Sequence, residues 1–156
     1  MSTTRPPGPA AFSESHYRAL FESIDLGLCV IELIFDADGR AVDYVFLEVN
    51  PAFTDHTGLK NVVGRRIREL VPAIEERWFR IFGDVARTGV PIRFEQEAAA
   101  LGRWYSVYAF RVDDPSQRHV AVLFRDISEQ KRTEEALRRS EAAQARARAH
   151  RRSGEP

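Results

Sequence analysis

The sequence has only one cysteine, Cys29, which excludes a disulfide framework and a cysteine-rich metal cluster. It also has no long apolar run, because the best one, residues 26–35, is short and contains Gly27 and Glu32. The sequence therefore predicts no membrane span, and its polar N-terminus does not resemble a signal peptide. Together these absences predict a soluble protein of a reducing compartment, and we expect a cytoplasmic location.

An excess of charge of either sign is missing too, since 23 lysines and arginines balance 23 aspartates and glutamates. The chain lacks the overall basic character of nucleic-acid-binding proteins, so no nucleic-acid partner is expected. Within this balance, residues 131–156 form a basic tail with 8 basic and 4 acidic side chains. Its arginines offer contacts to phosphate or anionic lipid, but the tail has no aromatic residue and no sustained amphipathic stripe. We favour a solvated linker helix as its interpretation.

Aromatic residues are absent after Phe124, so the end of the chain cannot build a core of its own. The 156 residues, of which 44% are hydrophobic, suffice for one sizeable core, and this core must precede the tail. At the other end, prolines at positions 6, 7 and 9 surround Gly8 and predict a disordered leader over residues 1–12.

The next part of the chain predicts a helix and a hairpin. Apolar residues at helical spacing predict a helix over residues 13–24. Two β-rich runs follow, residues 27–35 and 42–49, and the pair Asp38-Gly39 between them is typical of a tight turn. We expect these two strands to pair.

A group of helices is predicted after the hairpin. Pro51 cannot continue a sheet ladder but suits the first turn of a helix, which Asn50 can cap. Short helical pieces are expected over residues 51–71, and apolar spacing predicts a longer helix over residues 73–88 that Gly89 ends.

Three further strands are predicted over residues 91–98, 103–112 and 118–124. The order of elements favours an α+β fold, in which a five-stranded antiparallel sheet has helices on one face. Both phases of the last two strands are apolar, so the second face of the sheet also needs a cover. The first helix, a partner chain, or both could provide it.

A long helix is predicted over residues 126–150, with residues 151–156 as a disordered end. Asp126 can cap this helix, and Glu129 stands three residues later as a capping-box partner. Leu137 is its last large apolar residue, so beyond it we expect a frayed helix or one that depends on a partner.

The chain resembles the PAS sensory domains of bacterial signalling proteins, of the sensor histidine kinase type. Two motifs carry the resemblance: Asn50-Pro51-Ala52-Phe53 with Thr57-Gly58-Leu59 and Val63-Gly64-Arg65 after the second strand, and Asp126-Ile127-Ser128-Glu129 after the last one. It implies a PAS domain over residues 13–125, with an N-terminal cap helix, a cavity between sheet and helices, and a C-terminal signalling helix.

The resemblance also implies a function. Such a domain senses a ligand or a redox state and transmits the signal through its last helix to an output domain such as a histidine kinase. Signal transmission is assigned by the motif to Asp126, Ile127, Ser128 and Glu129. Homodimerisation through the N-terminal helix, the sheet face and the C-terminal helix is expected as well. The alternative is a scaffold that senses nothing and only pairs subunits.

Residue matching argues against two cofactors of the family. In its blue-light subgroup a reactive cysteine follows a Gly-Arg-Asn step, whereas Gly64-Arg65-Arg66 is followed here by Ile67, which disfavours a flavin adduct. Oxygen-sensing relatives bind haem through a histidine on the long helix, and residues 73–88 contain none. The cofactor therefore stays unknown at this point.

Strand and helix periodicity suggests which residues could enclose a ligand. The candidates share one predicted inner face or border it, and they are Cys29, Ile31, Leu33, Val45, Leu47, His56, Trp78, Phe82 and Trp104. A filled core explains the same residues, and we favour it, because aromatic stripes usually serve packing. His56 stands where the family usually has an apolar residue, which suggests a ligand contact, a pH-sensitive hydrogen bond or, as we prefer, a structural histidine.

A catalytic constellation was not found at useful spacing, neither a nucleophile with a base, nor a metal-ligand set, nor a glycine-rich phosphate loop. Paired carboxylates such as Glu95 and Glu97 are better interpreted as solvated charges. The sequence therefore predicts a regulatory module and not an enzyme, with no metal site.

Overall fold

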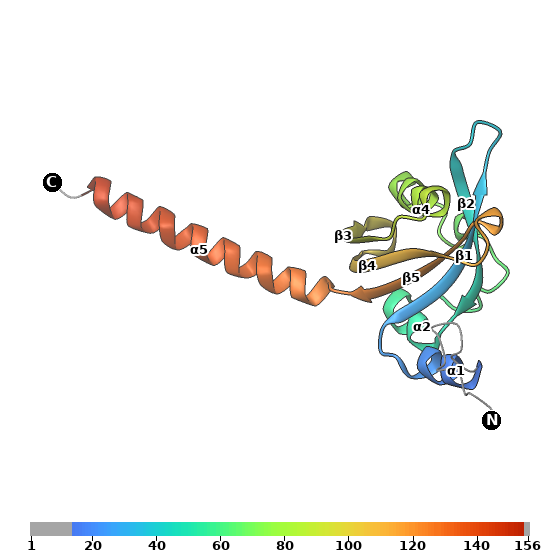
Figure 1. Cartoon of the computed structure of the whole chain (residues 1–156). Coiled ribbons are helices and arrows are strands. Elements are labelled where there is room, and N and C mark those ends of the chain that lie inside the picture. Colours follow the sequence, from blue (N-terminus) through green and yellow to red (C-terminus); the bar gives the residue numbers. More distant parts are fainter. Residues whose placement is uncertain (1–13, 155–156) are drawn as a thin grey trace, which may run out of the picture.

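The computed structural model describes residues 14–154, and its centre is one antiparallel sheet of five strands. These strands are β1 (Gly27–Phe35), β2 (Ala41–Val49), β3 (Ile92–Ala98), β4 (Arg103–Val112) and β5 (His119–Asp126). Their order across the sheet is β2-β1-β5-β4-β3 (Figure 1), so the last strand lies between the first hairpin and the β3–β4 pair. The predicted α+β fold with a five-stranded antiparallel sheet is confirmed.

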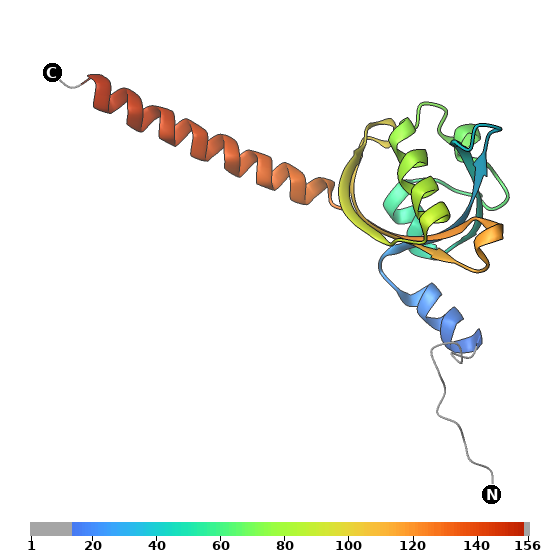
Figure 2. The same ribbon diagram turned by 45° about the horizontal axis from the view of Figure 1, so that its top comes forward.

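Helices lie on the concave face of this sheet. They are α2 (Pro51–Thr57), α3 (Ile67–Leu70) and α4 (Glu76–Thr88), and Figure 2 shows the sheet curving around α2 and α4. Two short 3-10 helices, η2 (Ala99–Leu101) and η3 (Pro115–Gln117), connect the later strands. The expected leader over residues 1–12 falls outside the described part of the chain.

Asn50 joins the first hairpin to the helices. Its side-chain Oδ1 accepts hydrogen bonds from the backbone N–H of Phe53, at 3.0 Å, and of Leu28, at 2.9 Å. Its Nδ2 donates to the carbonyl of Leu26 at 2.8 Å. The predicted N-cap is therefore confirmed, and the same side chain also ties the start of β1 to α2.

The hydrophobic core lies between the inner face of the sheet and α2, α3 and α4. Among its most deeply buried side chains are Ile31 from β1, Val62 before α3, Phe79 from α4 and Val120 from β5. Aromatic rings meet edge to face across it, for example Phe46 with Phe53 at 5.3 Å between ring centroids. Such pairs add to the stability gained from burial alone.

The opposite face of the sheet is only partly covered. Helix α1 (Glu14–Ser23) lies near the β2 end (Figure 1), where Phe21 and Leu47 border a shared groove. Its Leu20 stays 60% exposed and Ile24 36% exposed, whereas Phe21 is half-buried, so α1 buries its apolar side only in part. On β4 and β5, the outward side chains of Tyr108 and Leu123 are half-buried and have no helix over them.

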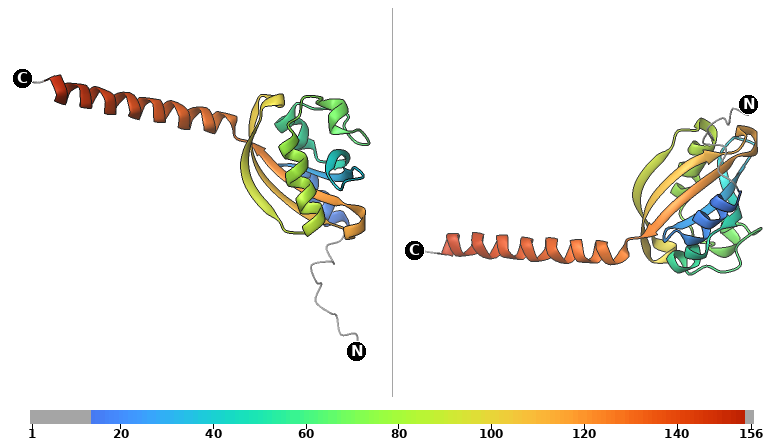
Figure 3. Two further views of the ribbon diagram at one scale, coloured as in Figure 1. Left: turned by 90° about the horizontal axis from the view of Figure 1, so that it is seen from above. Right: turned by 60° about the horizontal axis from the view of Figure 1, so that its bottom comes forward.

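Helix α5 (Ser128–Gly154) projects away from the body (Figure 3). It begins two residues later than expected and continues past residue 150, because alanine and arginine, which dominate its end, are strong helix formers. The predicted disordered end is wrong for residues 151–154, and residues 155–156 lie outside the described part. From Arg132 to Arg152 every side chain is exposed. Across residues 14–154, no helix combines the length and the apolar character needed to cross a membrane.

Candidate functional site

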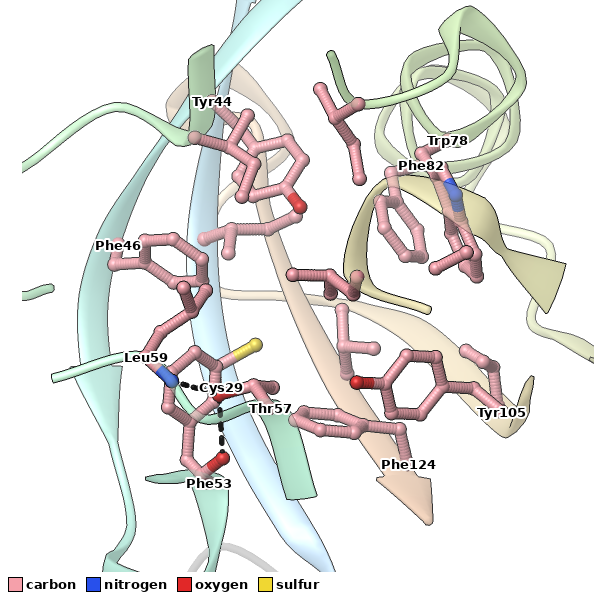
Figure 4. Close-up of a pocket in the computed structure, with 17 residues that line it drawn as sticks. Cys29, Tyr44, Phe46, Phe53, Thr57, Leu59, Trp78, Phe82, Tyr105 and Phe124 are labelled. Carbon is pink, nitrogen blue, oxygen red and sulfur yellow. Dashed lines mark hydrogen bonds between the residues drawn. The ribbon is translucent and has the colours of Figure 1, made fainter. Parts of the chain in front are cut away.

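An apolar cavity of about 70 Å³ lies between the sheet and the helices (Figure 4). Every helix and strand of the domain body except α1 contributes to its wall, and so do η2 and the loops beside α2 and α4. Its lining consists of Cys29, Ile31, Tyr44, Phe46, Phe53, Thr57, Leu59, Ile67, Ile74, Trp78, Phe82, Ala98, Leu101, Tyr105, Val107, Val122 and Phe124. None of these side chains is charged, so the cavity suits an uncharged, mainly apolar molecule.

Four of the predicted pocket residues meet at this cavity. Cys29 and Ile31 line it from β1, and Trp78 and Phe82 line it from α4. Leu33 is also buried, with 2% of its surface exposed, but it packs in the core beside the cavity. Whether the four residues bind a ligand stays a prediction.

The predicted phase of β2 is wrong. Val45 and Leu47 were expected to face inward, whereas Tyr44 and Phe46 are the buried residues that line the cavity. A register shift explains the difference: Val30 pairs with Glu48, but the next residue, Ile31, pairs with Phe46, so Leu47 is skipped. A bulge of this kind reverses the alternation on one side of it.

Trp104 lies outside the cavity, at the end of the sheet where α5 begins. The Lys131 ammonium group lies 5.1 Å from the centre of its indole ring and forms an ion pair with Glu95 at 2.7 Å. The neighbouring residue in β4, Tyr105, has the inward phase and lines the cavity. Sequence spacing alone could not choose between these two aromatic residues.

The polar groups in the wall are mostly paired with protein atoms. The Thr57 hydroxyl donates to the carbonyl of Phe53 at 2.8 Å and accepts from the N–H of Leu59 at 3.0 Å. The Tyr105 hydroxyl donates to the carbonyl of His56 at 2.8 Å, and burial raises the pKa of Tyr105 to about 12. Burial also raises the pKa of the Cys29 thiol and of the Tyr44 hydroxyl far above their ordinary values. Both groups are therefore neutral near pH 7.

His56 lies behind the cavity wall and does not line it. Its ring is 6.3 Å, between centroids, from that of Phe124, which forms part of the wall. Its Nε2 lies 2.8 Å from the carbonyl oxygen of Asp25, and its Nδ1 lies 3.1 Å from the backbone nitrogen of Asp126. Both ring nitrogens are thus paired with backbone groups, and His56 connects α2 to the end of β5. The choice between a pH-sensitive hydrogen bond and the preferred structural histidine stays a prediction.

Asp126 organises the start of α5, but not as the predicted capping box. Its Oδ1 accepts from the N–H of Ser128 at 2.9 Å and from the Ser128 hydroxyl. Its own N–H donates to His56, so Glu129, whose side chain is exposed, does not close a box there. The difference arises because the helix begins at Ser128, which leaves Asp126 one position too early for the N-cap.

Electrostatics favour the ionised form of Asp126. Burial opposes ionisation, but the hydrogen bonds from Ser128 and the charge of Arg103 outweigh it, so the pKa of Asp126 is lowered. The Arg103 Nε lies 3.8 Å from its Oδ2. The carboxylate thus remains a hydrogen-bond acceptor through the physiological range.

The junction is completed by β4. The backbone N–H of Trp104 donates to the Ser128 Oγ at 2.9 Å, and its carbonyl accepts from the N–H of Ile127 at 2.8 Å. Ile127 itself is buried, with 3% of its surface exposed. Asp126, Ile127 and Ser128 therefore fasten α5 to the sheet, while Glu129 has no part in these contacts among the described residues.

No metal-binding group of three or more histidine, cysteine, aspartate or glutamate side chains occurs within residues 14–154. Ile67, which follows Gly64-Arg65-Arg66, lines the cavity with an aliphatic side chain. Cys29 approaches the cavity from β1 instead, as a buried neutral thiol. At about 70 Å³ the cavity is also smaller than the apolar cavity of about 150 Å³ that holds benzene, so only a small molecule fits it as it stands.

Comparisons with known proteins agree with this architecture. A family model described as "PAS fold" matches residues 21–132. No curated protein sequence matches the chain significantly. An RNA-binding light-oxygen-voltage receptor superposes with a TM-score of 0.59 at 18% identity, covering 96% of this chain and 42% of that one. The chain therefore spans less than half of that receptor's length.

Two further solved structures are similar. The PAS domain of a LuxR-family transcriptional regulator from Burkholderia thailandensis, in complex with ethanol, has a TM-score of 0.50 at 16% identity and covers 72% of this chain and 97% of that one. The PAS domain of an HTR-like protein from Haloarcula marismortui has a TM-score of 0.49 at 23% identity and covers 72% and 90%. At 16% identity the likeness to the LuxR-family regulator shows the fold alone.

Proposed function

The chain belongs to the PAS family, and we propose that it is the sensory input module of a bacterial signalling protein. In this proposal a small molecule in the cavity alters the position of α5, which transmits the change to an output domain such as a histidine kinase. PAS domains are in general regulatory modules, so any kinase or cyclase activity is assigned to a domain outside this chain. The proposed location is the cytoplasm.

The observation that carries the proposal is the position of His56 between the cavity wall and α5. On one side, its carbonyl accepts from the cavity-lining Tyr105, and its ring packs against Phe124. On the other side, its Nδ1 accepts from Asp126, which in turn holds the first residue of α5. A displacement of Tyr105 or Phe124 by a ligand therefore acts directly on the start of α5.

The shape of α5 suits an output role. Ion pairs and ring contacts join it to the sheet only as far as Lys131 among the described residues. Beyond this point its side chains are exposed, and the helix projects from the body (Figure 1). A rigid helix fastened at one end converts a small shift at the sheet into a larger one at its far end.

Cavity filling provides a test that needs no known ligand. Ala98 is 2% exposed and lines the cavity, so Ala98→Leu places additional methyl groups inside it. The chain is fused through α5 to the catalytic part of a histidine kinase, and autophosphorylation is measured. We expect Ala98→Leu to change autophosphorylation at least about twofold, because a filled cavity shifts the equilibrium between two positions of α5.

The aspartate at the junction gives this test a matched control. Asp126 accepts from both the N–H and the hydroxyl of Ser128, and Asp114 makes the same two bonds to Ser116 in η3, which α5 does not contact. Adding Asp126→Ala should abolish the effect of Ala98→Leu, whereas adding Asp114→Ala should preserve it. An unchanged effect in the Asp126→Ala background would contradict the proposed route.

A second candidate function is a pairing scaffold that senses nothing. It is favoured by the small volume of the cavity and by the half-buried apolar side chains on the outer face of the sheet. In that case Ala98→Leu leaves kinase activity unchanged while subunits still associate. Homodimerisation itself is proposed under both functions, through α1, the outer sheet face and α5.

A further inference from the structure

The Tyr44 hydroxyl is the polar group of the cavity whose hydrogen-bonding capacity is unused. Tyr44 is 7% exposed, and within residues 14–154 its hydroxyl makes no hydrogen bond, unlike those of Thr57 and Tyr105. Figure 4 shows this hydroxyl directed toward the middle of the cavity. Among the described residues no fully buried side-chain oxygen lacks a partner, so the Tyr44 oxygen keeps some accessible surface, and an acceptor inside the cavity can form a hydrogen bond with it.

Packing does not explain why this residue is a tyrosine. The Tyr44 ring contacts those of Phe46, Phe79 and Phe82, with centroids 5.5 to 5.9 Å apart. A phenylalanine would make the same contacts, and it would leave no polar atom in the cavity. The hydroxyl is therefore the feature of Tyr44 that needs a separate explanation.

The surroundings define what such a partner can be. No charged side chain lines the cavity, and burial keeps both Tyr44 and Cys29 protonated, so a charged ligand would be desolvated without compensation. The hydroxyl carries a proton to donate, which calls for an acceptor. The rest of the wall consists of aliphatic and aromatic side chains, so the rest of the ligand should be apolar.

We propose that the cavity binds an uncharged molecule smaller than benzene, in which one carbonyl or hydroxyl oxygen accepts a hydrogen bond from Tyr44 and the carbon skeleton packs against the aromatic wall. This inference rests on the proposed function and specifies the ligand class of the same cavity. A cavity of about 70 Å³ sets the upper limit on size.

The test compares two probes with the same carbon skeleton and the same number of non-hydrogen atoms. Acetone has a carbonyl acceptor, whereas 2-chloropropane has only a chlorine, a much poorer acceptor. Both are titrated into the full chain, and affinities are measured by NMR from the methyl signals of Ile31 and Val122. We expect Tyr44→Phe to weaken acetone binding about 3- to 10-fold, the range for one neutral hydrogen bond, and to change 2-chloropropane binding less than about twofold.

A matched control removes a hydroxyl elsewhere. Tyr108 lies on the outward side of β4, where the Arg93 guanidinium stacks 4.0 Å from its ring centroid, so Tyr108→Phe should leave both affinities unchanged. The carbonyl carbon of ¹³C-labelled acetone gives a readout that needs no variant. Its signal should move downfield in the complex with the wild-type chain, as hydrogen bonding to a carbonyl requires.

The outcomes separate the two proposals. If both probes bind but Tyr44→Phe weakens them equally, or the carbonyl signal does not move, the assigned hydrogen bond is wrong while a sensory cavity for apolar molecules stands. If neither probe enters the wild-type cavity, this inference is overturned, and the response of the kinase fusion to Ala98→Leu then decides separately whether cavity occupancy is transmitted.

Discussion

His56 makes two hydrogen bonds that together fix the position of its proton. The carbonyl oxygen of Asp25 can only accept, so the Nε2 that lies 2.8 Å from it must carry the hydrogen. The backbone N–H of Asp126 can only donate, so Nδ1 must be unprotonated. The junction with α5 therefore depends on a single tautomer of the His56 imidazole.

We predict that at neutral pH the ¹⁵N spectrum shows His56 as the Nε2–H tautomer. His119 provides an internal comparison with the other tautomer, since its Nδ1 lies 2.8 Å from the carboxylate of Asp113 and must carry the hydrogen. A long-range ¹H–¹⁵N correlation spectrum distinguishes the two rings. Finding His56 with a protonated Nδ1 would mean that its bond to Asp126 does not form in solution.

A second prediction concerns Asp126 and the stability of the fold at low pH. Its pKa is lowered in the folded chain, so its ionised form contributes stability above the ordinary aspartate range near pH 4, and this contribution is lost as pH falls through the lower folded value. We expect Asp126→Asn to lower Tm by a few degrees at pH 7, because the charge interaction with Arg103 is lost. The gap between the two melting curves should close toward pH 3.

Circular dichroism at pH 7, 5, 4 and 3 measures this gap. Glu129→Gln serves as the comparison, because it removes a carboxylate from the exposed first turn of α5 without breaking a contact to the sheet. A gap for Asp126→Asn that stays constant, or that widens in acid, would show that ionisation of Asp126 is not favoured by folding.

Strands and helices could be predicted well from the sequence where local chemistry marks their ends. The β1–β2 hairpin follows from its Asp38-Gly39 turn, and the end of α4 follows from Gly89, which adopts φ of 73°. The phase of β2 could not be obtained this way, because both of its faces carry apolar residues. The bulge at Leu47 depends on pairing with β1, which alternation within one strand does not contain.

The candidate site shows the same division. Cys29, Ile31, Trp78 and Phe82 could be predicted because their elements have one apolar face toward the helices or the sheet. The bridging position of His56 could not, since it depends on a contact between residues 70 positions apart in the chain. A single histidine in a short helix carries no local sign of such a partner.

The joint between β1 and α2 gives a prediction at the level of these elements. Asn50 is 2% exposed and supplies three hydrogen bonds, to Leu28, Leu26 and Phe53. Asn50→Ala removes all of them and leaves backbone groups unpaired, so we expect a loss of about 2 to 4 kcal/mol in the free energy of unfolding. Urea denaturation measures it.

Asn50→Asp separates the two ends of this joint. The aspartate keeps an oxygen for the N–H of Phe53 and of Leu28, but it cannot donate to the carbonyl of Leu26. Its loss of stability should therefore be smaller than that of Asn50→Ala. If both variants unfolded at the wild-type urea concentration, Asn50 would not hold β1 and α2 together.

The whole molecule has two apolar regions with different exposure. The inner region is closed by α2, α3 and α4 and contains the cavity, whereas the outer face of β4 and β5 has half-buried apolar side chains. A groove on this outer face is bordered by Tyr108 and Leu123 and also by the charged side chains of Arg93, Glu95 and Arg125. Apolar side chains with polar ones around them are typical of an interaction site.

Helix α5 also has a feature that indicates an interaction with a partner. Its Leu137 is 59% exposed, although it is the last large apolar residue of the chain. The helix does not end there, so the remaining expectation from the sequence is dependence on a partner. A second copy of the chain that covers the outer sheet face also brings a second α5 alongside the first.

We therefore predict that the wild-type chain is a dimer at micromolar concentration and that Leu123→Glu weakens the dimer at least about tenfold, because a charge would be buried at the centre of the interface. Val90→Glu is the matched control, since Val90 is 65% exposed in the turn between α4 and β3, away from the outer face of β4 and β5. Sedimentation equilibrium and native mass spectrometry measure both. A wild-type monomer would place the partner of the outer face and of α5 outside this chain. Equal weakening by the two substitutions would mean that the dimer interface is not centred on Leu123.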